Sequence, residues 1–138
     1  MPIQLNHTIV HARDHLTSAR FLTGLFELPP PVELGPFAIV PFGETSLDFI
    51  GTQDDFTPQH YAFLVTEAEF DAIFARIRAG KLPHWSDPGR RNAGSINTWD
   101  GGRGVYFDDP DGHLLEIITR PYGSGGSTAE QPHPLLSA

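Results

Sequence analysis

The sequence predicts an α+β fold in which two tandem βαβββ modules form a cleft between two curled sheets. Two observations predict it. A strand pattern, an amphipathic helix and three short extended segments follow one another in the first half of the chain, and the same order returns in the second half. The 138 residues suffice for one compact domain that contains both modules.

The first module is expected over about residues 1–52. Residues 5–11 (LNHTIVH) alternate apolar and polar side chains, which is typical of a strand. Asp14 can cap a helix over residues 15–26, whose apolar side chains recur at helical spacing and which ends before three consecutive prolines. Three short extended segments separated by glycine-containing turns are expected at residues 32–34, 37–42 and 46–52.

The second module is expected over about residues 56–123. Its first strand is 59–65 (QHYAFLV), and Thr66 with Glu69 forms a capping box before an amphipathic helix. The other strands are expected at 84–87, 103–108 and 113–120, the last two joined through an Asp-Pro-Asp-Gly turn. Residues 1–123 would thus form the single domain, and residues 124–138, rich in Gly, Ser and Pro, a flexible C-terminal tail.

Composition excludes several function classes. The chain has no cysteine, which excludes disulfides, thiolate nucleophiles and cysteine-based zinc sites. Its formal charge of −8 makes nucleic acid an unfavourable partner. There is no apolar run near the roughly 20 residues that cross a bilayer, and the N-terminus lacks the pattern of a signal peptide. We therefore expect a cytoplasmic protein that binds neither nucleic acid nor membrane.

Four side chains stand out at matching places in the two modules. His7 and His60 each lie in the first strand of a module, while Asp48 and Glu116 each lie in an apolar last strand. A carboxylate in such a strand is costly to bury without a cation. Taken singly, each residue is better explained by an ordinary hydrogen bond or by exposure at a sheet edge. Together they favour one divalent metal, and imidazole with carboxylate suits Fe, Mn, Co, Ni or Zn.

Three segments of the chain resemble the vicinal oxygen chelate superfamily, which includes glyoxalase I, fosfomycin-resistance proteins, bleomycin-resistance proteins and type I extradiol dioxygenases. They are LNH at 5–7, QHYAF at 59–63, and VYFDDPDG at 105–112 followed by Glu116. The resemblance covers about residues 3–122. It implies His7, His60 and Glu116 as metal ligands, with Asp48 at the place of the fourth ligand of glyoxalase I. It also implies a homodimer, whose metal sites are often built from both chains.

The resemblance implies a divalent-metal-dependent enzyme whose small-molecule substrate chelates the metal through neighbouring oxygens, as in glyoxalase-like lyases and isomerases. Glu116 would be a base as well as a ligand. One alternative is an Fe(II) extradiol-type dioxygenase, and another is a non-catalytic, drug-binding resistance protein. Ile9 and Ser86 depart from the fosfomycin-resistance pattern, and Asn97 stands near the place of the catalytic histidine of extradiol dioxygenases.

The wall of the substrate pocket is expected to include the polar loop 89–102 and the strand after it, and four residues are candidates for holding a substrate. These are Trp99, Arg103, Tyr106 and Arg120. Arginine favours carboxylates and phosphates. The alternative is that both arginines are surface charges and that Tyr106 is a core aromatic residue.

Overall fold

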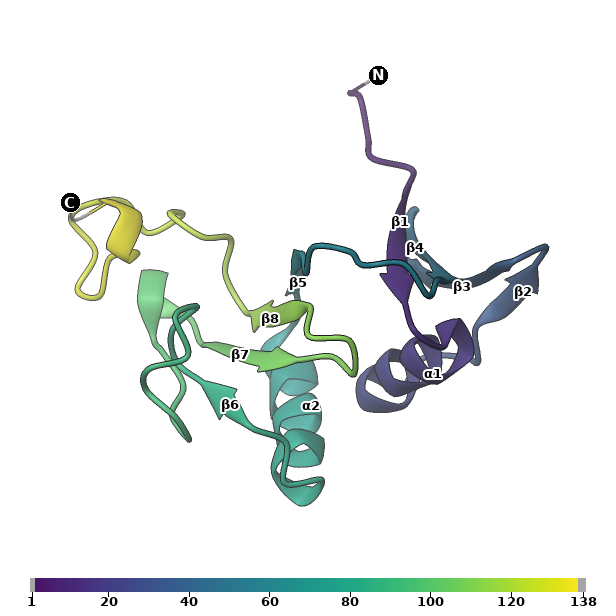
Figure 1. Cartoon of the computed structure of the whole chain (residues 1–138). Coiled ribbons are helices and arrows are strands. Elements are labelled where there is room, and N and C mark those ends of the chain that lie inside the picture. Colours follow the sequence, from purple (N-terminus) through teal and green to yellow (C-terminus); the bar gives the residue numbers. More distant parts are fainter. Residues whose placement is uncertain (1, 137–138) are drawn as a thin grey trace. The chain divides into compact units, whose positions relative to one another are not determined.

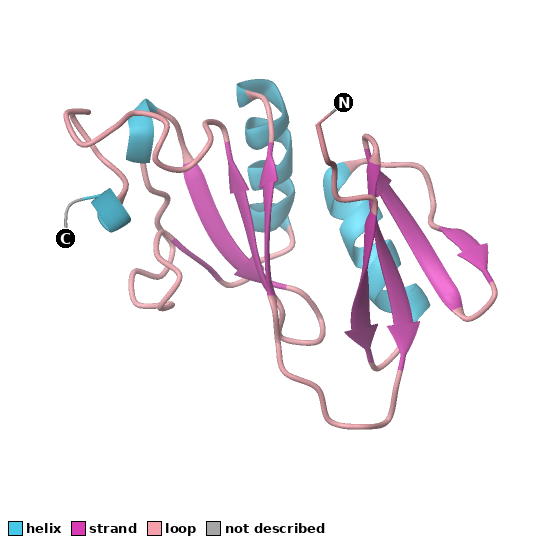
Figure 2. Cartoon of the chain, turned by 90° about the horizontal axis from the view of Figure 1, so that it is seen from above, coloured by secondary structure: helices cyan, strands magenta, loops and turns pink. Residues whose placement is uncertain are grey.

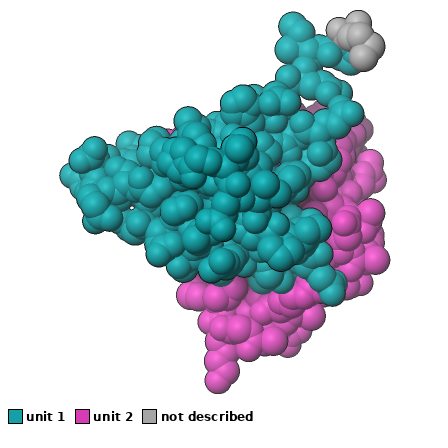
Figure 3. Space-filling model, turned by 90° about the vertical axis from the view of Figure 1, so that its right-hand side faces the viewer, with its two compact units in different colours: residues 1–58, 109–112 teal, residues 59–108, 113–138 magenta. Residues whose placement is uncertain are grey.

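The computed structural model describes residues 2–136 and divides into two compact units (Figures 1 and 3). The first comprises residues 1–58 together with the turn 109–112, and the second comprises residues 59–108 and 113–138. Each unit contains one helix packed with one four-stranded sheet (Figure 2). The predicted α+β fold of two βαβββ modules is confirmed.

The first unit follows the predicted element order. Its elements are β1 (His7–Ala12), α1 (His15–Phe26), β2 (Val32–Leu34), β3 (Phe37–Phe42) and β4 (Thr45–Gly51). The sheet order is β1-β4-β3-β2, with β1 parallel to β4 and the other two pairs antiparallel. The first and last strands of the module, β1 and β4, therefore lie side by side.

Alternation along β1 and β4 decides which face of this sheet is buried. Val10 and Ala12 are buried on β1, and Leu47 and Phe49 on β4. Residues of odd number on β1 and of even number on β4 point to the opposite face. That opposite face therefore carries His7 and Asp48. Helix α1 begins where the Asp14 carboxylate accepts from the backbone N–H of Thr17 at 3.0 Å.

The second unit repeats this order and adds two short 3₁₀ helices. Its elements are β5 (His60–Leu64), α2 (Glu67–Ala79), β6 (His84–Trp85), η1 (Trp99–Gly101), β7 (Gly104–Asp108), β8 (Leu114–Ile118) and η2 (Pro134–Leu136). The sheet order is β5-β8-β7-β6, with β5 parallel to β8. The topology is therefore that of the first unit.

The core of the second unit lies between α2 and its sheet. Phe70 and Ile77 are fully buried on the helix, and Phe107 and Ile117 are fully buried on the strands. Each such side chain contributes about 1.5–3 kcal/mol when it leaves water. The predicted capping box is present, because the Thr66 hydroxyl accepts from Glu69 N–H and the Glu69 carboxylate accepts from Thr66 N–H. Glu116 and Tyr106 lie on the other face of the sheet, away from the helix.

The chain continues beyond β8 along a folded path. Residues 121–136 pass through two turns and end in η2, while Ser137 and Ala138 of the expected tail lie outside the described residues. That this tail is flexible stays a prediction, as do the domain bounds. In the described part of the chain, every helix is too short or too polar to span a bilayer.

Candidate metal centre

His60 and Glu116 form a close pair on the open face of the second sheet. In the parallel β5–β8 pair, Ala62 lies beside Glu116 and His60 beside Leu114. This register brings His60 Nε2 to 3.2 Å from Glu116 Oε1. Glu116 is only 6% exposed, whereas the His60 ring is half exposed. A buried carboxylate therefore faces an imidazole ring that is half exposed to solvent.

A backbone hydrogen bond fixes which His60 nitrogen is available to a ligand. Nδ1 lies 2.9 Å from the carbonyl oxygen of Leu114, which only accepts, so Nδ1 carries a proton. In the neutral ring, the lone pair is then on Nε2, beside the Glu116 carboxylate. The hydrogen bond to Glu116 raises the pKa of His60 above its ordinary value of 6.5, against the opposing effect of burial. The pair can therefore share either a proton or a divalent cation.

Tyr106 completes the surroundings of Glu116. It lies opposite Glu116 in the β7–β8 register, and its ring stacks on His60 with centroids 6.0 Å apart. Burial raises the pKa of the Tyr106 phenol, and the charge of Glu116 and a hydrogen bond to it raise the pKa further. The phenol therefore stays protonated and donates to Glu116, which limits the positions that the carboxylate can take.

The first unit repeats the register but not the contacts. His7 lies beside Ser46, and Ile9 lies beside Asp48, which is the pattern of His60 and Glu116. However, the Asp48 carboxylate accepts from the Ser46 hydroxyl at 2.7 Å. His7 Nδ1 donates to the side-chain oxygen of Asn6 at 2.6 Å. As in His60, this bond leaves Nε2 of the neutral ring as the nitrogen that can bind a metal.

Of the four predicted ligands, the structure brings together only His60 and Glu116 within one unit. His7 and Asp48 belong to the other unit. Across residues 2–136, no group of three or more His, Asp or Glu side chains is gathered closely enough to hold a metal ion. The pair His60–Glu116 is therefore a partial site, and the predicted four-residue set stays a prediction.

The four predicted substrate-binding residues lie in different settings. Arg103 is held in place, since it donates to Glu67 at 2.9 Å, pairs with Asp71 at 2.8 Å and covers the ring of Phe70 at 4.4 Å. The side chains of Trp99, Arg103 and Arg120 line a small cavity beside Glu116.

The same cavity has two wall residues that the sequence did not indicate, Tyr122 and His133. Asn97 also lines it, and its amide donates to the carbonyl of Ser86 at 3.0 Å. No sequence motif marks Tyr122 and His133, because their place in the cavity wall depends on how the segment after β8 folds back. An aromatic residue and a histidine in a Gly- and Pro-rich segment were the only signals available.

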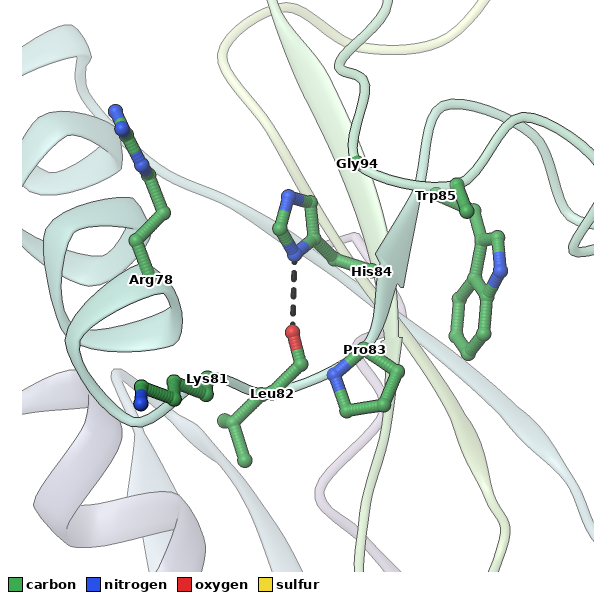
Figure 4. A pocket seen from close by; sticks show the side chains of 8 residues that line it. Arg78, Lys81, Leu82, Pro83, His84, Trp85 and Gly94 are labelled. Atoms are coloured by element: carbon green, nitrogen blue, oxygen red, sulfur yellow. Dashed lines mark hydrogen bonds between the residues drawn. The ribbon is translucent and has the colours of Figure 1, made fainter.

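A second cavity, of about 380 Å³, lies at the C-terminal end of α2 (Figure 4). His84 Nδ1 donates there to the carbonyl of Leu82 at 3.0 Å. The cations Arg78 and Lys81 are placed where positive charge offsets the helix dipole. None of the predicted site residues lines this cavity.

Comparison with known proteins places these observations in a family context. The family model described as "Glyoxalase/Bleomycin resistance protein/Dioxygenase superfamily" matches residues 4–117. The solved structure of oxidase ChaP-H1 is 58% identical, with a TM-score of 0.86, and the match covers 88% of this chain and 99% of that chain. The solved structure of oxidase ChaP-H2 is 55% identical, with a TM-score of 0.88, and the match covers 91% of this chain and 100% of that chain.

A curated relative matches over a shorter stretch. The metallothiol transferase FosB of Shouchella clausii (strain KSM-K16) is 40% identical over 62 residues. These residues are 44% of this chain and 37% of that protein, so the match spans little more than a third of that relative's length.

Proposed function

Because the chain belongs to the glyoxalase/bleomycin resistance protein/dioxygenase superfamily, we propose that it is a divalent-metal-dependent enzyme that oxidises a small molecule bound through two neighbouring oxygens. The His60–Glu116 pair carries this proposal, since a buried carboxylate faces a ring nitrogen whose lone pair is oriented toward it. The choice of oxidation is supported by 58% and 55% identity to proteins named as oxidases, over nearly their whole length.

The proposed metal ligands are His7, His60 and Glu116. Two imidazoles and one carboxylate suit non-haem Fe(II), which supplies oxygen chemistry and charge stabilisation at its open positions. Asp48 is proposed to stay outside this set, because its carboxylate already accepts from Ser46 in the first unit.

The remaining residues of the second unit would act on the ligand and on Glu116. Tyr106 would hold the carboxylate in one orientation, as groups hydrogen-bonded to metal ligands commonly do. Trp99 and Arg120 would form the wall that meets the substrate. Arg103 is proposed to link the start of β7 to α2 rather than to bind the substrate, because its guanidinium already forms ion pairs with Glu67 and Asp71.

Metal analysis combined with oxygen uptake tests the proposal. Protein purified without oxygen would be loaded with Fe(II), Co(II), Ni(II) or Zn(II), and its metal stoichiometry compared with that of His60→Gln and of Asp48→Asn. We expect one metal per chain in the unsubstituted protein and in Asp48→Asn, and none in His60→Gln. Catechol addition to the Fe(II) form should then consume oxygen. Absence of bound metal in every form would refute the proposal.

A glyoxalase-like lyase or isomerase is the second candidate. It is favoured by one observation, namely that Asp48 occupies in the first unit the register position of Glu116 in the second. In this case Asp48 would be a fourth ligand and Glu116 would also act as base. Oxygen-independent turnover of a hemithioacetal with Ni(II) or Co(II), lost in Asp48→Asn, would favour this candidate over oxidation.

We also propose a cytoplasmic homodimer. Dimerisation is supported by exposed apolar side chains on the strands at the sheet edges, namely Ile9, Val32, Leu34 and Leu64. Light scattering coupled to size-exclusion chromatography should give a mass near twice 15.2 kDa. A monomer at micromolar concentration would contradict this proposal without affecting the metal site.

A further inference from the structure

The segment that follows β8, residues 121–136, is fastened to the turn that carries η1. The Asp100 carboxylate accepts from the backbone N–H groups of Gly123 at 2.8 Å and Gly125 at 3.2 Å. The Asp100 N–H donates to the carbonyl of Gln131 at 2.7 Å. Asp100 is 3% exposed, so a buried carboxylate serves as the anchor. The two short helices accordingly lie near each other in Figure 2.

Aromatic contacts link this segment to the proposed metal site. The His133 ring lies 4.9 Å from Trp99 and 5.6 Å from Tyr122, measured between centroids. Trp99 in turn lies 6.3 Å from Tyr106, which stacks on His60. The segment therefore reaches the site through a continuous series of rings.

The cavity beneath these rings is very small while the segment is in place. Its wall includes Glu116 on the sheet side and Tyr122 and His133 on the segment side. Its volume is about 10 Å³, and one water molecule needs about 10–15 Å³. An organic ligand therefore cannot occupy this space unless part of its wall moves.

The attachment of the segment is of a kind that can be released. Its apolar ends remain outside the core, with Leu135 73% and Leu136 43% exposed. A hollow of about 690 Å³ is lined both by the segment, at Ala129 and Glu130, and by the turn around Asp100. Gly123 and Gly126 have positive φ, at 77° and 73°, and glycine gives the backbone there the freedom to change conformation. Few buried apolar contacts and a small number of polar bonds mark segments that open locally.

We propose that residues 121–136 form a displaceable strap that closes the cavity beside Glu116 and opens, by release from Asp100, to admit the small molecule that binds there. The identity of that site rests on the proposed function, whereas the opening of the strap does not. His133 and Tyr122 are the strap side chains that would contact the bound molecule. Loops that close over a site exclude water from it, and their opening often controls the rate of binding.

Fluorescence quenching tests the opening in the metal-free protein. In a Trp85→Phe background, Trp99 is the remaining tryptophan, and its access to acrylamide measures whether the strap is open. Asp100→Asn keeps a residue type that tolerates the left-handed backbone at this position (φ 61°). The two glycine N–H groups bond to different oxygens of Asp100, and in Asn an NH₂ donor replaces one of these acceptors. We expect the quenching constant to rise by about twofold or more.

Matched variants separate the strap from general damage. Asp87→Asn makes the same change at another carboxylate that accepts two backbone N–H bonds, from Arg91 and Asn92, outside this cavity, so it should leave Trp99 quenching unchanged. His133→Ala removes the ring contacts without touching Asp100 and should raise quenching as Asp100→Asn does. Unchanged quenching in both strap variants would overturn the proposal.

A binding-rate measurement connects the strap to the site. Tropolone, a planar chelator with two neighbouring oxygens, would be mixed with the Co(II)-loaded protein and followed by absorbance. Asp100→Asn should bind it about tenfold faster, since the lost hydrogen bonds shift the strap toward its open form. Increased quenching with an unchanged association rate would overturn the strap as the gate of this site. If the unsubstituted protein binds no Co(II), the proposed function fails, and the quenching result alone decides the strap.

Discussion

The two units share a strand register but differ in what the register brings together. At matching places, the first unit carries His7, Asp48 and Ile39, and the second carries His60, Glu116 and Tyr106. In the second unit these side chains form a connected cluster. In the first unit, His7 and Asp48 each bond to a nearby polar side chain, Asn6 and Ser46.

This difference indicates that side-chain length and the strand next to the carboxylate decide whether a repeated position forms a histidine–carboxylate pair. Glu116 is one methylene longer than an aspartate and reaches His60, which lies on β5 two residues before Ala62, the register partner of Glu116. Tyrosine on β7 supplies a donor to the carboxylate, whereas Ile39 on β3 supplies none. Ser46, placed beside His7, offers Asp48 a hydrogen bond within the same strand instead.

The largest expected difference is between two single variants, one that removes the proposed ligand of the second unit and one that removes its counterpart in the first unit. Glu116→Gln should lower affinity for Co(II) by more than the roughly 10–100-fold that loss of a hydrogen-bonded partner costs, because it removes the charge that faces His60. Asp48→Asn should change the affinity by less than about threefold, since Asp48 is bonded to Ser46. Isothermal titration calorimetry measures both affinities.

Equal losses in the two variants would abolish the distinction between the units. They would also restore the four-ligand site and move the favoured reaction toward lyase or isomerase chemistry. His7→Gln belongs in the same series, because a loss as large as that of Glu116→Gln is expected if the first unit supplies the third ligand.

A smaller effect is expected from the residue that supports Glu116. Tyr106→Phe keeps the ring that stacks on His60 and removes the hydroxyl that donates to Glu116. Metal affinity should fall by about tenfold, in the range typical of a partner of a metal ligand. The matched substitution in the first unit, Ile39→Val, should leave affinity unchanged. An unchanged affinity in Tyr106→Phe would show that the phenol does not orient the carboxylate.

The sequence predicted the fold well because the code for it is local. The aromatic and branched residues of QHYAFLV and the helical spacing of Phe70, Ile73 and Ile77 are both patterns among near neighbours in sequence, and the structure places β5 and α2 where these patterns indicate. The parallel pairing of first and last strands is not local. It was therefore not part of the prediction, although it determines which residues meet.

The site was predicted less completely for the same reason. His60 and Glu116 could be singled out because their strands give them matching places in the chain. The engagement of Arg103 by Glu67 and Asp71 depends on how α2 lies against β7, and no sequence pattern reports it. His133 lies beside the candidate site on a segment that is anchored to Asp100, and this contact joins residues over 20 positions apart.

The helix caps give a comparison in stability rather than in binding. The Thr66 hydroxyl accepts from Glu69 N–H in the second unit, and Thr66→Ala should lower the free energy of unfolding by about 1 kcal/mol. Thr66→Ser keeps the acceptor and should lose little. Asp14→Ala removes the matching cap of the first unit and should destabilise in the same direction. Urea denaturation monitored by circular dichroism measures these changes, and no loss in Thr66→Ala would show that this cap does not stabilise α2.

The smallest expected effect is the pH dependence of stability that His60 contributes. The hydrogen bond to Glu116 raises the pKa of His60 in the folded protein above the value of 6.5 expected when unfolded. The folded state therefore holds this proton more tightly, so the stabilisation is fully present below pH 6.5 and is lost as pH rises through the folded pKa. Because the ring is half exposed, it should amount to no more than about 1 kcal/mol.

Urea midpoints of the metal-free protein and of His60→Gln, compared between pH 5.5 and 8.5 in chelator, measure this contribution. The unsubstituted protein should be the more stable at the acidic end, and the gap should narrow toward the alkaline end. His7→Gln reports how much the loss of any exposed histidine alters the curve. If the difference in urea midpoint between the unsubstituted protein and His60→Gln widens with pH, a shared proton does not hold His60 against Glu116. The contrast between the His60 pair and His7 would then need a cause other than the Glu116 carboxylate.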